Sequence, residues 1–225
     1  MKQALTVFFR YIEPVFVFAL FAAVPIAQSG ANTAFAFPSL SQGAFMGISG
    51  IWLWMSYRFF TPPRSASCPL YSVPRSLLSA FAVFAFLCAS GIFFFTLSGS
   101  RIRFNAADPS PLLIAVIAAA AFFEEILYRA YLPAKARVLL PRPRFFLQRK
   151  QMTRVVPEIF CVILFSAAHL RGGVFSALNA FFAGAALQIC FAKTNSVVLT
   201  GSVHAAYNIT ALAWLLWHNG AGRSS

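Results

Sequence analysis

Residues 118–133, AAAAFFEEILYRAYLP, place two adjacent carboxylates and an arginine inside an otherwise apolar helical segment. An ionisable side chain at membrane depth costs at least about 2.5 to 3.5 kcal/mol. Acidic side chains retained in such a segment usually serve a function. The glutamate pair is therefore the first candidate for a functional site.

The two glutamates differ in their neighbours on the helix. Glu124 and Glu125 point about 100° apart, and only Glu125 has Arg129 four positions later, where opposite charges meet. Glu124 shares its face with Tyr128 and with the small residue Ala120, which lets another helix approach. We expect Glu124 to face the interior of a helical bundle. In the alternative interpretation, Glu125 and Arg129 form a structural ion pair and Glu124 has no role.

The composition excludes an ordinary soluble domain. Of 225 residues, 60% are hydrophobic, 10% are charged and 27 are Phe, whereas soluble domains are about half apolar and a quarter charged. The chain is thus predicted to be an integral membrane protein in contact with the lipid bilayer. Its net charge of +13 lies mainly between the apolar runs, so no nucleic-acid partner is expected. The cysteines lack metal-ligand spacing and are interpreted as small apolar residues: Cys68, Cys88, Cys161 and Cys190.

About seven apolar runs approach the 20 or so residues that a membrane-spanning helix needs. They lie near residues 7–28, 44–60, 76–97, 111–132, 155–170, 174–192 and 196–217. We therefore expect an all-α, polytopic transmembrane bundle. Residues 1–110 would hold three N-terminal spans, residues 111–217 a catalytic helical core, and residues 218–225 a short polar tail. The first run also resembles a signal peptide, but its length and the Glu13-Pro14 pair argue against cleavage.

The basic residues predict the orientation. With seven spans, four basic residues lie on the side away from the N-terminus: Arg101, Arg103, Arg171 and Arg223. Thirteen lie on the N-terminal side, seven of them in the predicted loop 133–154: Lys2, Arg10, Arg58, Arg64, Arg75, Lys135, Arg137, Arg142, Arg144, Arg149, Lys150, Arg154 and Lys193. This bias predicts a cytoplasmic N-terminus in a bacterial inner or plasma membrane. Alternatively, the basic loop recognises an acidic substrate or lipid.

Two of the three histidines lie inside apolar runs. His169 follows Phe165 by four positions, and Asn208 follows His204 by four, so each pair shares one helix face. Taken singly, such polar residues often only join transmembrane helices by hydrogen bonds. Together with Glu124, in a chain with five acids and three histidines, they indicate a site.

The three motifs occur in a recognisable order, each on a separate apolar run. They are EExxxR (Glu124, Glu125, Arg129), FxxxH (Phe165, His169) and HxxxN (His204, Asn208). This order resembles the CPBP family of intramembrane proteases, which includes type II CAAX-prenyl endopeptidases and bacterial Abi proteins. The resemblance covers about residues 111–217, and one departure is Ala130, where many members have glycine. It implies a glutamate-dependent intramembrane endopeptidase.

The residue types suit peptide hydrolysis. A desolvated carboxylate is a stronger base, so Glu124 is expected to activate water, and His169 to orient that water or carry its proton. Asn208 and His204 would stabilise the oxyanion. The supporting residues would be Glu125, Arg129, Phe165 and Tyr128. The expected substrate is a membrane-anchored protein or peptide, cut near its C-terminus from a cavity open to the cytoplasm.

Two alternatives stay open. Two histidines and one or two glutamates resemble an open zinc site, but HExxH is absent and Asn is a poor ligand, so no obligatory metal or other cofactor is expected. The other alternative is a non-catalytic binding or immunity protein, or a small transporter, using the same polar cluster. Transporters usually show paired, broken helices, which this sequence lacks. The substrate and the oligomeric state are left open.

The predicted ends of the fourth and fifth spans conflict with the placement of Glu124 and His169 in one site. Helical rise places Glu124 about 20 Å from the outer end of its span and His169 about 22 Å from the inner end of the next. In a hydrocarbon core of about 30 Å, the two side chains would differ in depth by about 12 Å. Either the fifth span begins deeper than Val155 or the helices tilt strongly.

Overall fold

The computed structural model describes residues 8–18, 40–60, 73–98, 111–139 and 152–221. Over these residues the chain is helical and has no strand, which confirms the all-α prediction. By length and composition, three of the described helices can cross a membrane: Pro74–Ser98, Pro111–Arg137 and Val174–Thr194. Val155–Ala168 is a shorter apolar helix.

The helices follow the predicted apolar runs. In chain order they are η1 (Phe8–Ile12), α2 (Glu13–Phe18), α4 (Leu40–Phe60), α5 (Val73–Ser98), α6 (Pro111–Glu125), η4 (Ile126–Tyr131), α7 (Leu132–Leu139), α9 (Met152–Ala168), η5 (Leu170–Gly172), α10 (Val174–Thr194) and α11 (Val197–Ala221). The first run is described only over η1 and α2, and the rest of it lies outside the described residues. Helix α11 continues to Ala221, so the predicted polar tail begins later than residue 218.

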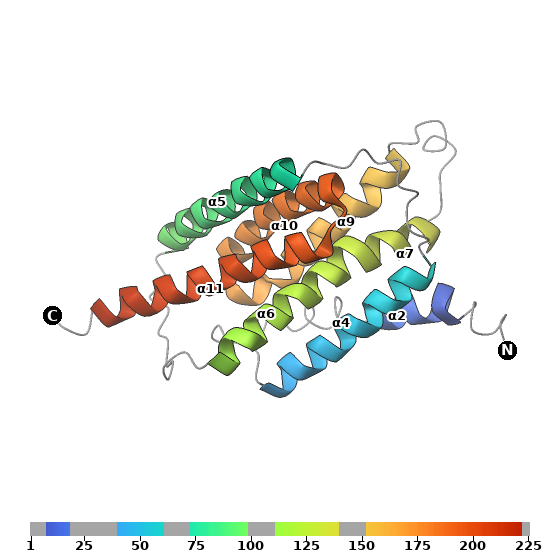
Figure 1. Ribbon diagram of the computed structural model, residues 1–225, viewed down its shortest axis with the longest axis horizontal. Helices are drawn as coiled ribbons and strands as arrows, with labels where there is room; N and C mark the ends of the chain where they lie inside the picture. Colours follow the sequence, from blue (N-terminus) through green and yellow to red (C-terminus); the bar gives the residue numbers. More distant parts are fainter. Residues whose placement is uncertain (1–7, 19–39, 61–72, 99–110, 140–151, 222–225) are drawn as a thin grey trace.

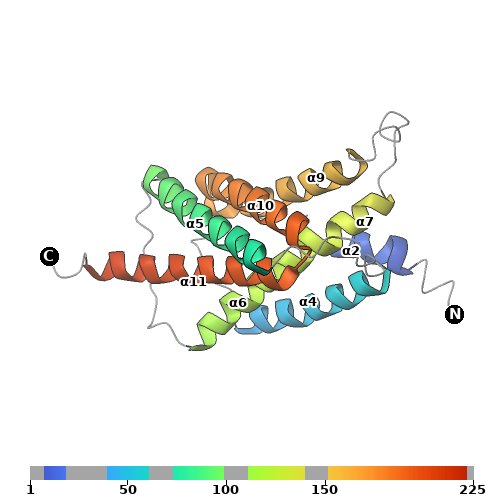
Figure 2. The same cartoon turned by 45° about the horizontal axis from the view of Figure 1, so that its top comes forward.

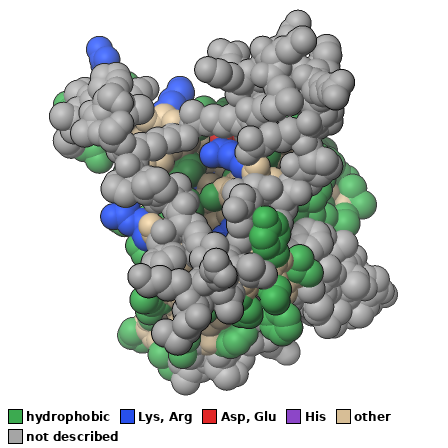
Figure 3. All heavy atoms as spheres, turned by 90° about the vertical axis from the view of Figure 1, so that its right-hand side faces the viewer, with side chains coloured by type: hydrophobic (Ala, Val, Ile, Leu, Met, Phe, Trp, Pro, Cys, Tyr) green, Lys and Arg blue, Asp and Glu red, His purple; other side chains and the backbone are tan. Residues whose placement is uncertain are grey.

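The helices form a bundle in which chain direction alternates (Figures 1 and 2). Helices α4, α6 to α7 and α10 run one way, whereas α5, α9 and α11 run the other way. We call the end that holds the last turns of α4, α7 and α10 the basic end, and the opposite end the far end. Basic residues near the basic end are Arg58, Arg75, Lys135, Arg137 and Lys193. Figure 3 looks onto this end, where Lys and Arg side chains stand among apolar ones.

One helical segment runs from α6 through η4 into α7, with a π-helical turn at η4. The N–H of Leu132 bonds to the carbonyl of Leu127, five residues back. Pro133 supplies no N–H and its ring would collide with the carbonyl four residues earlier, so the wider turn accommodates it. The predicted loop 133–154 is therefore wrong at both ends, because helix continues to Leu139 and resumes at Met152.

Short turns connect α9, α10 and α11. Gly173 has φ +89°, a conformation that favours glycine, and joins η5 to α10. Asn195 adopts the left-handed conformation and ends α10, with its N–H on the carbonyl of Phe191 at 2.7 Å. The hydroxyl of Ser196 then accepts the N–H of Leu199 at 3.1 Å and caps α11. The tight turn fixes α11 beside α10.

Helix α11 approaches α6 closely just before His204. A Cβ added to Gly201 would lie 2.6 Å from Cδ1 of Phe122, so only glycine fits this crossing without a shift. Helix α10 approaches α9 at Gly184, where a Cβ would lie 3.0 Å from Phe165. Both glycines bring the polar motifs of neighbouring helices together.

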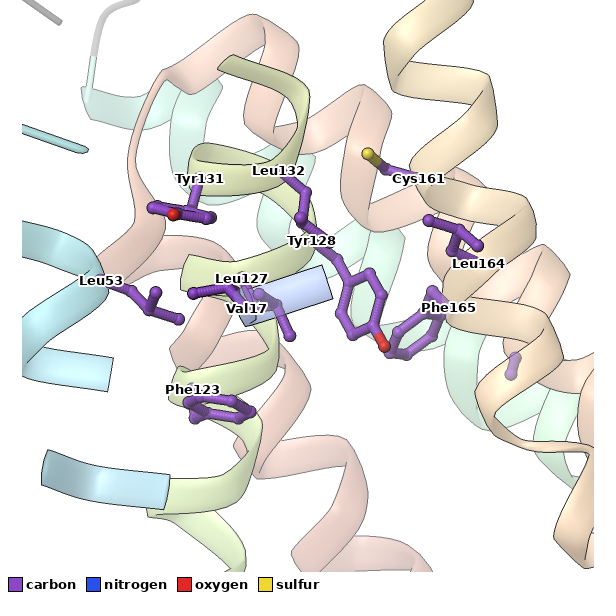
Figure 4. Close-up of a cluster of buried hydrophobic side chains, with 11 residues drawn as sticks. Val17, Leu53, Phe123, Leu127, Tyr128, Tyr131, Leu132, Cys161, Leu164 and Phe165 are labelled. Atoms are coloured by element: carbon purple, nitrogen blue, oxygen red, sulfur yellow. The ribbon is translucent and has the colours of Figure 1, made fainter. Parts of the chain in front are cut away.

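The main apolar core surrounds η4 (Figure 4). Leu53, Leu127, Tyr131 and Phe165 are each at most 2% exposed, and they join helices α4, η4 and α9. Much of the core lies on the side of the glutamates that faces the basic end, because η4 continues from α6 in that direction, while Phe123 extends it to the other side.

A second buried charged group, which sequence reasoning missed, anchors the N-terminal segment. The carboxylate of Glu13 accepts hydrogen bonds from Trp52 Nε1 at 3.0 Å, Ser56 Oγ at 2.9 Å and Lys135 Nζ at 3.2 Å. The sequence signal for this group was the acidic residue Glu13 inside the first apolar run. Its basic partner Lys135 lies 122 positions away, so the pair could not be predicted from local spacing.

Candidate active site

Glu125 is the fully buried member of the glutamate pair. Its Oε2 lies 3.5 Å from Arg129 Nε, so the predicted pair forms, and both side chains are 0% exposed. Its Oε1 lies 3.1 Å from His204 Nδ1 on α11. Glu125 therefore joins α6 to η4 and to α11.

Glu124 faces the interior cavity of the bundle, as its helical face predicted. Its side chain is 25% exposed, and its Oε2 lies 3.7 Å from His204 Nε2. His204 thus stands between the two carboxylates, with one ring nitrogen toward each. The partner that Glu124 lacks on its own helix is supplied by another helix.

His169 lies at the end of α9 with a defined ring orientation. Its Nδ1 lies 2.8 Å from the carbonyl oxygen of Phe165. Because a carbonyl only accepts, Nδ1 carries the proton in this contact and Nε2 keeps its lone pair. His169 can therefore accept a proton from a water or substrate in the cavity through Nε2.

The ring of Phe165 contacts several residues of the site. Its ring centroid lies 4.6 Å from that of His169, 6.1 Å from that of His204 and 5.3 Å from that of Tyr128. The guanidinium of Arg129 lies 4.8 Å from the same ring. The Phe165 ring thus contacts Tyr128, Arg129 and both histidines.

These side chains border a cavity of about 930 Å³. Its polar lining includes all four predicted catalytic residues: Glu124, His169, His204 and Asn208. Glu124 and His169 thus border the same cavity, although the predicted boundaries placed them at different depths. Helix α9 begins at Met152, three residues before the predicted start at Val155.

A second polar group on the cavity wall had no recognisable motif. Ser90 Oγ lies 3.0 Å from Asn179 Oδ1 and 3.0 Å from the carbonyl of Leu87, and Asn179 Nδ2 lies 3.0 Å from the hydroxyl of Tyr207. Ser90, Asn179 and Tyr207 together carry four polar hydrogens: one on each of the two hydroxyl groups and two on the amide. The three contacts above use at most three of these hydrogens. At least one remains for a molecule in the cavity, which Asn179 and Tyr207 line.

The Tyr207 hydroxyl occupies space left by a glycine on α5. A Cβ added to Gly91 would lie 2.5 Å from that oxygen. Tyr207 follows His204 by three positions, about 4.5 Å along the helix axis. This spacing was the available sequence signal, but its partners on α5 and α10 were not predictable from it.

Among the described residues, no three His, Cys, Asp or Glu side chains form a group that could hold a metal ion. Structural and catalytic zinc sites use at least three such ligands.

The fold and the site together define an integral membrane protein of helical type, with a carboxylate and histidine cluster bordering an internal cavity. The family model described as type II CAAX prenyl endopeptidase Rce1-like matches residues 106–210. This match covers 105 of the 225 residues and confirms the resemblance based on the three motifs. No curated protein and no solved structure matches the chain.

The cavity lies in the half of the bundle nearer the far end. Its lining on α5 begins at Cys88, that on α10 ends at Ala183, and that on α11 begins at His204. Most of the described basic residues lie near the other end, whereas Arg171 belongs to η5, between the cavity-lining residues His169 and Gly172.

Proposed function

We propose that the protein is an intramembrane endopeptidase in which Glu124 activates the attacking water. The observation that supports this proposal is the position of Glu124. It borders the cavity with His169, His204 and Asn208, whereas Glu125 is fully buried in an ion pair. The two adjacent glutamates thus have environments suited to different roles, one chemical and one structural.

In the proposed reaction, water attacks the scissile carbonyl while Glu124 takes its proton. Nε2 of His169 accepts a hydrogen bond from the same water and orients it. The proton held by Glu124 then passes to the leaving amine as the C–N bond breaks. The products are a carboxylic acid and an amine.

The tetrahedral intermediate needs hydrogen-bond donors at its oxyanion. The side-chain amide of Asn208 is the proposed donor. His204 donates a hydrogen bond to Glu125 through Nδ1. Its other ring nitrogen, Nε2, lies 3.7 Å from Glu124 and is the one that would contact the reacting groups. Glu125 and Arg129 hold that imidazole in place.

The proposed substrate is a membrane-associated protein or peptide, cut near its C-terminus. Prenylated CAAX ends, sorting tails, bacteriocins and signal peptides all have this character. The largely apolar cavity supports a substrate with an apolar segment or a lipid anchor. We further propose that the protein lies in a bacterial plasma membrane with the basic end in the cytoplasm, because basic residues gather at one end of the bundle.

A comparison of C-termini in membrane proteomes tests this function. Cells would carry the wild-type chain, Glu124→Gln or Glu158→Gln, the last removing an acid outside the cavity that pairs with Arg137. We expect a set of C-termini in the wild type and Glu158→Gln cells that is missing with Glu124→Gln. Identical C-termini in all three, with equal amounts of protein, would favour a binding or immunity role instead.

A further inference from the structure

We infer that the side-chain amide of Asn179 anchors the substrate by donating a hydrogen bond to one of its main-chain carbonyls, away from the bond that is cut. Ser90 and Tyr207 hold this amide, and we call the three residues the anchoring group. The inference deepens the proposed function and rests on it for the existence of a substrate. It gives a role to polar side chains that the proposed reaction does not use.

The anchoring group lies where three helices meet. Ser90 is on α5, Asn179 on α10 and Tyr207 on α11, and these helices pack against one another (Figures 1 and 2). Ser90 is buried, whereas Asn179 and Tyr207 are partly buried and line the cavity that Glu124 also lines. The group is therefore placed to contact the same molecule as the proposed water-activating carboxylate.

One hydrogen of the Asn179 amide has no use within the anchoring group. The Ser90 hydroxyl donates to the carbonyl of Leu87 at 3.0 Å, because a carbonyl only accepts. The amide lies 3.0 Å from the Ser90 hydroxyl and 3.0 Å from the Tyr207 hydroxyl. Whether its nitrogen faces Tyr207 or is turned to face Ser90, one of its two hydrogens is used there. In either orientation the second hydrogen is left for a molecule in the cavity.

The charge of the cavity lining favours an uncharged acceptor at this position. The described residues that line the cavity include no Lys or Arg. A negatively charged group bound at Asn179 would thus lose its contact with water and gain no such partner, which is costly. Main-chain carbonyls are neutral acceptors that every peptide carries, and each one left unpaired in an apolar space is destabilising. The unused amide hydrogen therefore fits a main-chain carbonyl of the substrate.

The anchoring group is held in place before a substrate arrives. Ser90 and Tyr207 contact the two ends of the amide from α5 and α11. The Tyr207 hydroxyl has room there because α5 carries Gly91, where an added Cβ would lie 2.5 Å from that oxygen. A donor whose orientation is fixed in advance loses less conformational freedom on binding. The arrangement thus favours binding over a role in the chemical step.

The anchored carbonyl belongs to a different peptide unit from the one that is cut. Asn208, the proposed oxyanion donor, directly follows Tyr207 on α11, so the two side chains leave the helix about 100° apart. Successive residues of an extended peptide advance about 3.3 Å, so a bound segment presents several carbonyls in a cavity of about 930 Å³. The reacting carbonyl faces Asn208, and another carbonyl pairs with Asn179.

The experiment measures cleavage kinetics of the full chain in detergent micelles. The substrate is a synthetic peptide that spans a cleavage site found by the comparison of C-termini. In a series of variants of this peptide, an ester replaces one peptide bond at a time, the cleaved bond excepted. Each ester makes the carbonyl of that unit a weaker acceptor.

With the wild-type chain we expect one ester to raise KM about three- to tenfold, as loss of one neutral hydrogen bond does. Asn179→Leu should raise KM for the unmodified peptide by a similar factor and change kcat by less than about twofold. The same ester should then raise KM of Asn179→Leu by less than about twofold, because the contact is already lost. An effect that arises from the lost N–H of the ester unit would persist in this variant.

Gln188→Leu is the matched control. Gln188 lies on the same helix as Asn179 and is buried, and its Oε1 has no hydrogen-bond partner among the described residues. We expect its KM to equal that of the wild type and the ester to keep its full effect. Should Asn179→Leu fail to fold, Tyr207→Phe replaces it, and the ester effect should be at least about twofold smaller than in the wild type.

Ester effects of equal size in the wild type and Asn179→Leu would overturn the inference, because the anchored carbonyl would then contact other residues. A lower melting temperature of Asn179→Leu with an unchanged KM would also overturn it and make Asn179 a purely structural residue. Both results leave cleavage intact. If no C-terminus depends on Glu124, the proposed function fails and the inference fails with it, so the two failures are distinguishable.

Discussion

Replacing Arg129 by methionine should destabilise the protein chiefly because Glu125 is left as a buried, unpaired charge. Both side chains are 0% exposed and 3.5 Å apart. Breaking a buried ion pair by removing one partner costs about 3 to 5 kcal/mol. His204 still donates to Glu125, so we expect the lower end, about 3 kcal/mol. Loss of the guanidinium over the Phe165 ring adds about 0.5 to 2 kcal/mol.

The double variant Glu125→Gln with Arg129→Met separates these two terms. It removes both charges, so only the ring contact is lost, and a glutamine oxygen can still accept from His204. For a chain of this size 1 kcal/mol corresponds to about 2 to 4 °C in Tm. We expect the double variant to melt about 6 to 12 °C above Arg129→Met in detergent micelles, followed by tryptophan fluorescence.

Equal melting temperatures for Arg129→Met and the double variant would refute this reasoning. The arginine would then stabilise the fold through its packing against Phe165, and the charge on Glu125 would carry no penalty. A double variant less stable than Arg129→Met would also contradict the argument.

Three further predictions concern other contacts. Asn208→Ala should lower kcat by about two to three orders of magnitude, as loss of an oxyanion donor does; an equal loss of folded protein would make Asn208 structural. Tyr207→Phe should raise KM about three- to tenfold and change kcat by less than about twofold, because it removes a neutral hydrogen-bonding group from the cavity wall. An unchanged KM would exclude contact between the Tyr207 hydroxyl and the substrate. Glu13→Ala should lower the free energy of unfolding by about 3 kcal/mol, because it removes the buried acceptor shared by Trp52, Ser56 and Lys135. Glu158→Ala, whose partner is 31% exposed, should cost about 1 kcal/mol or less, and equal losses in thermal unfolding would contradict this contrast.

The spacing of residues along single helices predicted several contacts of the site. The i and i+4 positions of Glu125 and Arg129 predicted their ion pair, and the same spacing predicted the contact between Phe165 and His169. These contacts depend only on 3.6 residues per turn, so they survive any uncertainty about how helices pack. The apolar runs likewise predicted helices α4 to α11, because a membrane-spanning segment must satisfy its backbone internally.

Contacts between helices were not predictable in the same way. The position of His204 between Glu124 and Glu125 depends on the close crossing at Gly201, which no local pattern encodes. The group of Ser90, Asn179 and Tyr207 joins three helices and involves residue types common at helix contacts. Pro133 predicted the end of a helix, yet a π-helical turn accommodates it.

The sequence by itself determined that this is a helical membrane protein, which polar residues are candidates for its chemistry and where its basic residues cluster, because these follow from composition and from periodicity along one helix. Only the tertiary structure decided which glutamate borders the cavity and which is buried, and on which side of the core the cavity lies. Those features depend on how several helices pack against one another, and that packing is a property of the whole bundle.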